Sequence, residues 1–87
     1  MLLGNFPLIQ SRVNIYMGYS ARSIRFRYTE WVAFDLETRK PDFDQVSAVE
    51  LYDHERDNGE MENVHGKSEF AAVERQFANV LRERLAR

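Results

Sequence analysis

The chain has 87 residues, of which 44% are hydrophobic, and its formal net charge is −2. This length allows one small domain with one modest core, because such a chain buries only about 60 to 65% of the surface that it exposes when unfolded. Cysteine is absent, which excludes disulfides, thiolate metal sites and a cysteine nucleophile. No stretch approaches the ~20 apolar residues of a membrane-spanning helix, so no membrane partner is expected.

The first twelve residues, MLLGNFPLIQSR, resemble a secretion signal in their apolar character. They lack its basic start, however, and Asn5 and Pro7 interrupt the apolar run. We therefore expect no signal peptide and a cytoplasmic location for the chain as encoded.

Charge is unevenly distributed along the chain: residues 1–29 carry arginines but no acid, whereas residues 30–87 are acidic on balance. We expect this asymmetry to draw two parts of one fold together.

Residues 17–34 are rich in aromatic and β-branched side chains and alternate with a period of two, which predicts strand. The stretch exceeds an ordinary strand in length, so a turn is expected near Ser23 to Arg25, giving a hairpin. The alternation places two sets of side chains on opposite faces. Those on the core face are Ile24, Phe26, Tyr28, Val32 and Phe34, and those on the outer face are Arg25, Arg27, Thr29 and Trp31.

Residues 35–47 are polar and show no period, which predicts a loop. Residues 48–55 alternate again and predict a third strand, whose inward candidates are Val49, Leu51 and His54. This strand is expected to end in a tight turn, with Asn58-Gly59 supplying a positive φ.

From Ser68, interpreted as an N-cap, apolar side chains recur with a period of 3.6 and predict an amphipathic helix. Its stripe comprises Phe70, Val73, Phe77, Val80, Leu81 and Leu85. Acids gather toward its start and arginines toward its end, which suits the helix dipole, and Glu83 is spaced to meet Arg87. The elements together predict an α+β fold, a small antiparallel sheet of three to four strands with one C-terminal amphipathic helix packed on it.

The acidic run DHERDNGE has the alternate acids of a calcium loop. The loop template requires glycine where Asn58 stands and a bidentate acid where Val64 stands, so calcium binding is not expected. His54 and His65 are not spaced as two metal ligands on one helical face, and no nucleophile motif accompanies them. We predict no metal site, no cofactor and no catalytic residue in this chain.

Three arginines, Arg22, Arg25 and Arg27, alternate with aromatic residues and form a candidate anion-binding face for a single-stranded nucleic acid or a sulfated sugar. A stacking platform needs rings and charges on one side of a sheet, whereas the alternation separates them. The interpretation that we favour is an aromatic core beneath an arginine-lined outer face, which argues against a nucleic acid partner.

Two linked motifs carry a further signal. The first is GYSARS at 18–23 followed by FRYTEW at 26–31, and the second is ELYD at 50–53, DNGE at 57–60 and then Asn63. They resemble the C-terminal end of sulfatases, most closely the iduronate-2-sulfatase-like branch. Asn58 stands where that branch usually has proline, which implies a looser turn. The resemblance covers 17–87 and leaves 1–16 as an unmatched N-terminal segment.

The resemblance implies the small C-terminal sheet of a sulfatase, packed on a larger catalytic domain. Such enzymes hydrolyse sulfate esters with a formylglycine beside calcium, and they are often exported or lysosomal. Their Cys/Ser-x-Pro-x-Arg motif is absent from this sequence. The resemblance therefore implies a non-catalytic fragment or remnant, and the alternative is a free-standing binding or interaction module that reuses the subdomain.

A subdomain separated from its large neighbour would expose apolar surface. Trp31, Phe34 and the leading MLLGNFPLI are the groups that we expect to be exposed. The expected partners are therefore a second copy of the chain, giving a homo-oligomer, or a sulfatase catalytic domain.

Overall fold

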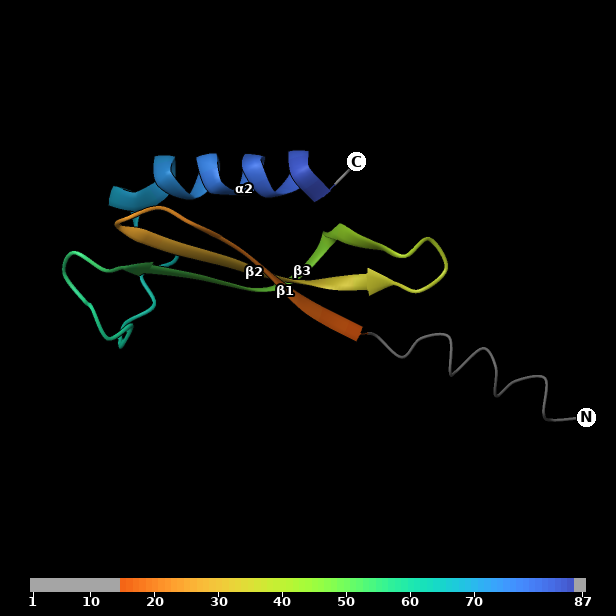
Figure 1. Ribbon diagram of the computed structural model, residues 1–87, viewed down its shortest axis with the longest axis horizontal. Helices are drawn as coiled ribbons and strands as arrows, with labels where there is room; N and C mark the ends of the chain where they lie inside the picture. Colours follow the sequence, from red (N-terminus) through yellow and green to blue (C-terminus); the bar gives the residue numbers. More distant parts are fainter. Residues whose placement is uncertain (1–14, 86–87) are drawn as a thin grey trace, which may run out of the picture.

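The computed structural model describes residues 15–85 (Figure 1). Three antiparallel strands form one sheet in the order β1-β2-β3, and they are β1 (Ile15–Arg22), β2 (Phe26–Asp35) and β3 (Lys40–Asp53). A 3₁₀ turn, η2 (Ser68–Phe70), leads into the helix α2 (Ala71–Leu85), which lies along one face of the sheet (Figure 1). The predicted α+β fold is confirmed, with three strands.

The hairpin of β1 and β2 turns at residues 23–25, as predicted. Ser23 closes this turn with its backbone N–H on the Phe26 carbonyl (2.9 Å) and its hydroxyl accepting from the Phe26 N–H (3.0 Å). Ile24 lies at the tip and is fully exposed, so its predicted place on the core face is wrong. Alternation of faces holds only while the chain is extended, and it is lost in the turn.

The third strand begins earlier than predicted, because β3 starts at Lys40 and the loop predicted over 35–47 shrinks to a turn at 36–39. The pairing of β2 with β3 shifts register twice, since Trp31 pairs with Ala48, Val32 with Val46, and Ala33 with Asp42. Residues 43–45 therefore bulge out of the ladder. The bulge breaks the period of two, which is why the sequence pattern concealed this part of the strand.

The core lies between α2 and the covered face of the sheet. It comprises Phe26, Tyr28, Leu51, Val64, Phe70 and Leu81. The ring of Phe77 stacks on Tyr28 with centroids 5.6 Å apart, and Phe70 meets Phe26 edge to face at 5.7 Å. Most of the predicted helical stripe is confirmed, but Val80 is 43% exposed and belongs to the solvent side.

Two further details of the predicted elements are wrong. The residue that caps η2 is Lys67, without a side-chain hydrogen bond, while Ser68 already lies inside the 3₁₀ turn. The positive φ of the loop falls on Glu60 (55°) and not on Asn58-Gly59.

The predicted partner of Glu83, Arg87, lies outside the described residues, as does most of the unmatched N-terminal segment. Within residues 15–85 no helix is long and apolar enough to cross a membrane.

Candidate functional site

Charged side chains that pair with one another gather where the loop after β3 meets the turn between β1 and β2. The backbone N–H of His54 donates to the carbonyl of Arg25 (2.7 Å), which ties the loop to the hairpin. The elements thus bring together side chains that are about thirty positions apart in the sequence. We call this group, made of Arg25, Arg27, Asp53, His54 and Glu60, the loop cluster.

Arg25 and Asp53 form the first pair of the loop cluster. The Nε and Nη2 of Arg25 each donate to one oxygen of Asp53 at 2.8 Å, and the guanidinium lies 4.8 Å from the centroid of the Phe26 ring. Asp53 is only 2% exposed because it lies on the core face of the sheet opposite Phe26. The hydrogen bonds from Arg25, reinforced by the backbone N–H of Glu55, lower the pKa of Asp53 to about 2.

The sequence pattern predicted His54 as an inward side chain at the end of the third strand. The structure places Asp53 there instead, since β3 keeps its period of two from Leu51 to Asp53. Val49, the remaining inward candidate, packs at the margin of the core. A buried carboxylate at a strand end is tolerated here because a bidentate arginine compensates its charge.

Arg27 and Glu60 form the second pair of the loop cluster. Both oxygens of Glu60 accept from Arg27 at 2.7 Å, and the Arg27 guanidinium lies 5.1 Å from the Tyr52 ring centroid. The Nε2 of His54 approaches Glu60 Oε2 to 2.6 Å. Hydrogen bonds from Arg27 and then from His54 lower the pKa of Glu60 to about 2.

The three arginines of the candidate anion-binding face do not share one side of the sheet. Arg22 and Arg27 are register partners, so their side chains project from the same face, away from α2. Arg25 lies in the turn and pairs with Asp53 on the covered side, so its predicted place on the outer face is wrong. Arg22 is exposed and makes no ion pair within residues 15–85, whereas the other two are held by carboxylates. Anion binding by this face stays a prediction.

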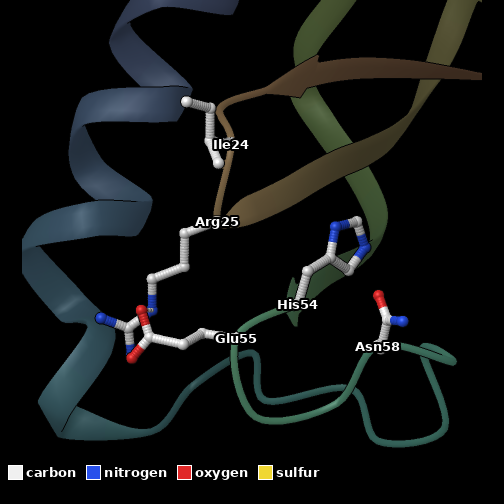
Figure 2. A pocket seen from close by; sticks show the side chains of 5 residues that line it. All are labelled: Ile24, Arg25, His54, Glu55 and Asn58. Atoms are coloured by element: carbon white, nitrogen blue, oxygen red, sulfur yellow. Dashed lines mark ion pairs between the residues drawn. The ribbon is translucent and has the colours of Figure 1, made fainter.

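A shallow hollow opens beside the loop cluster, lined by Ile24, Arg25, His54, Glu55 and Asn58 (Figure 2). Figure 2 shows Arg25 and Glu55 turned toward each other on one side, with His54 and Asn58 on the other; the Arg25 Nε lies 3.9 Å from a Glu55 oxygen. Asp53 already pairs with the Arg25 guanidinium and Glu60 with the His54 imidazole, so the Glu55 carboxylate and the Asn58 amide are the polar groups that the hollow offers to a ligand. Across the described part of the chain, no three His, Asp or Glu side chains are grouped as a metal site would require.

The most buried acid was not singled out from the sequence. Glu30 is 1% exposed, and its Oε2 accepts from the Tyr28 hydroxyl (2.5 Å) and from Arg82 Nη1 (3.0 Å). Its Oε1 is buried and has no partner within residues 15–85. Burial, reinforced by the hydrogen bond to Glu30, raises the pKa of Tyr28. A signal did exist, because Glu30 is two positions beyond Tyr28 and so shares its inward face.

The remaining motif residues organise the sheet and the loop. The Asn63 amide accepts from the Leu51 N–H (2.9 Å) and donates to the Val49 carbonyl (3.0 Å), so it satisfies the outer edge of β3 as a neighbouring strand would. The carboxylate of Asp57 accepts from the backbone N–H groups of Met61 (3.0 Å) and Glu62 (2.8 Å). These contacts fix the conformation of the loop, which places Glu60 beside Arg27.

Trp31 and Gly18 face each other on the side of the sheet that α2 leaves open. They are register partners, and a Cβ built on Gly18 would stand 2.9 Å from the indole ring. The indole therefore lies directly over the glycine, and its Nε1 donates to Glu50 (2.5 Å). Glu50 in turn accepts from the Tyr52 hydroxyl (2.9 Å). Trp31 remains 39% exposed, as predicted, whereas Phe34 is half-buried.

The architecture of residues 15–85 defines a small α+β unit, one helix on a three-stranded antiparallel sheet, whose ionic groups are largely paired with one another. Over 57 residues, 66% of the chain, the sequence is 40% identical to iduronate 2-sulfatase of Mus musculus. The predicted resemblance to that branch of sulfatases is thus confirmed. The matched segment spans 10% of the mouse protein's length. No protein-family model matches the chain, and no solved structure does.

Proposed function

We propose that this chain is a non-catalytic subdomain derived from a sulfatase, with a structural and not a chemical role. One observation carries this proposal: apart from Arg22, the ionic residues of the shared motifs are used inside the subdomain itself. Asp53 and Glu60 each form a bidentate ion pair with an arginine, and Asn63 hydrogen-bonds to the edge of β3. Groups that are saturated by internal partners can stabilise a fold but have little capacity left to act on a substrate.

The chemistry of sulfate ester hydrolysis supports the same view. The resemblance implies a formylglycine nucleophile and calcium, and this sequence has neither the motif that gives rise to the first nor a grouped set of acids in residues 15–85 for the second. The residues present do not fit these groups. We expect the purified chain to leave an aryl sulfate intact in the presence of excess calcium.

A structural role requires a partner surface. The start of β1 exposes Ile15, Tyr16 and Met17 to between 42% and 43%, and Trp31 stands on the open face. One partner for this surface is a sulfatase catalytic domain, since the similarity covers only a small part of a much longer enzyme. A second copy of the chain could cover the same surface, and that arrangement has its own test below.

A graft tests the proposed role. The matching 57-residue segment of mouse iduronate 2-sulfatase would be replaced by the corresponding residues of this chain. We expect the chimera to fold and to retain sulfatase activity, because the ion pairs of the loop cluster form within the subdomain and need no partner from the rest of the enzyme. A matched chimera with Asp53→Ala should lose folded yield, since Arg25 would be left without its partner.

Two outcomes would contradict the proposal. Turnover of an aryl sulfate that follows the purified chain through successive columns would make the chain an enzyme. A chimera that misfolds, although the isolated chain melts cooperatively, would favour the free-standing interaction module.

A further inference from the structure

We propose that Asn58 is a site of spontaneous covalent modification, in which its side chain cyclises onto the backbone of Gly59 and loses ammonia. The chain contains one Asn-Gly pair, and it lies in the loop between β3 and η2. This inference goes beyond the proposed function and does not depend on it.

The reaction needs an asparagine amide and a following backbone nitrogen that are both free. Asn58 and Gly59 are exposed, and neither the Asn58 amide nor the Gly59 N–H makes a hydrogen bond within residues 15–85. Neighbouring N–H groups are occupied instead, since Glu60 donates to the Asp57 carbonyl and Met61 to the Asp57 carboxylate. In Figure 2 the Asn58 side chain points into the open hollow, on the same side as His54. Glycine also places no Cβ beside the attacking nitrogen.

The step balances without any co-reactant except water. The Gly59 nitrogen attacks Cγ of Asn58, a new C–N bond closes a five-membered succinimide, and the side-chain amide nitrogen leaves as ammonia with the proton from the Gly59 nitrogen. Water then opens the ring at either carbonyl carbon, which leaves aspartate or isoaspartate at position 58. Proximity favours the ring because nucleophile and carbonyl belong to adjacent positions of one chain.

Two other asparagines in the described part of the chain serve as internal references. The Asn63 amide is held by Leu51 and Val49, so it cannot rotate toward its own backbone. Asn79 is exposed but lies inside α2, where the following N–H belongs to the helical ladder and the next residue, Val80, is β-branched. We expect Asn58 to convert while these two persist.

Gly59→Ala supplies a variant that keeps the fold. A Cβ at this position would meet only Met61 Cγ at 3.6 Å, an ordinary contact, and the φ of Gly59 is not positive. The added methyl group hinders the attacking nitrogen and restricts the backbone, so conversion of Asn58 should slow by about tenfold or more. A thermal melt equal to that of the parent would show that the variant keeps the stability of the fold.

The experiment is incubation of the full chain at mildly alkaline pH, with peptide mapping by mass spectrometry and enzymatic detection of isoaspartate. The expected result is a mixture of aspartate and isoaspartate at position 58 in the parent and a slow reaction in Gly59→Ala. Asn58 surviving as long as Asn79 would overturn the proposal. So would aspartate without isoaspartate, or a Gly59→Ala chain that reacts at the parental rate.

Discussion

At the scale of single residues, Gly18 is the position at which one added carbon atom has the clearest effect. Gly18→Ala would place a Cβ 2.9 Å from the Trp31 ring, so the indole, whose Nε1 donates to Glu50, must move from its present position. We expect the free energy of unfolding to fall by about 1 to 3 kcal/mol, the usual cost of overpacking. Because Trp31 is the only tryptophan, its fluorescence reports the displacement directly.

The control for this variant is Gly59→Ala, where the new Cβ makes an ordinary contact. Its urea midpoint and fluorescence should equal those of the parent. A Gly18→Ala chain with unaltered emission and stability would show that the indole does not rest on the glycine.

Arg82 is a second residue whose loss should be costly, because it compensates the buried Glu30. Arg82→Ala would leave that carboxylate with only the Tyr28 hydroxyl, and we expect a loss of about 2 kcal/mol. This is below the value for a fully buried pair, since Arg82 is partly exposed. Chemical denaturation measures the difference.

A double-mutant comparison separates charge compensation from general helix effects. In a Glu30→Gln background, Arg82→Ala should cost much less, because no buried charge is left unpaired. Arg84→Ala, in the same last turn of α2, is the matched control and should change little. Equal costs of Arg82→Ala in both backgrounds would contradict the assignment.

At the scale of elements, β3 depends on Asn63 to complete its outer edge. Asn63→Ala removes the acceptor for Leu51 N–H and the donor to Val49 carbonyl, so we expect the free energy of unfolding to drop by about 2 kcal/mol. Hydrogen exchange should show faster exchange of the Leu51 amide, and urea unfolding gives the energy. Asn79→Ala on the exposed face of α2 is the control, and a Leu51 amide that stays protected would refute the role of Asn63.

At the scale of the whole molecule, the two bidentate pairs make stability depend on pH. The pKa of Asp53 is lowered from 3.8 to about 2 and that of Glu60 from 4.5 to about 2. A group whose folded-state pKa is depressed contributes stability above its unfolded pKa, and that contribution is lost as pH falls through the folded value. The urea midpoint should therefore decline between about pH 4.5 and pH 2.

Asp53→Asn should lower the midpoint at neutral pH and flatten this decline. Asp44→Asn is the control, because the Asp44 carboxylate makes no ion pair within residues 15–85. A parental midpoint that stays constant over this range of pH would mean that the pairs are not formed in solution.

Self-association also belongs to the whole molecule. The structure describes no neighbour on the outer edge of β1, whereas Asn63 and Val64 hydrogen-bond to the outer edge of β3. We predict a dimer through β1, because an uncovered strand edge flanked by exposed apolar side chains is a template for pairing. Light scattering over a range of concentrations measures the mass.

Met17→Lys, which places a charge on β1, should return the chain to a monomer. Met61→Lys, at an exposed loop position on the opposite edge of the sheet, should leave the dimer intact. A parental chain that remains monomeric from micromolar to millimolar concentration would exclude this association.

Local patterns in the sequence determined the order of the elements, the hairpin turn and most of the helical stripe. They could do so because a period of 2 or 3.6 records which side chains an extended or helical backbone turns toward a core. The resemblance to sulfatases was carried by residues that are close together in the chain, and it too could be read from the sequence.

The tertiary structure alone decided the start of β3, the side on which Arg25 lies and the partners of Glu30. A bulge shifts register through backbone pairing, a turn releases its side chain from alternation, and the Glu30–Arg82 pair joins positions 52 residues apart. None of these leaves a local period in the sequence. Whether a charged residue faces water or a core depends on the partner that the fold delivers to it, and that partner is set by packing across the whole domain.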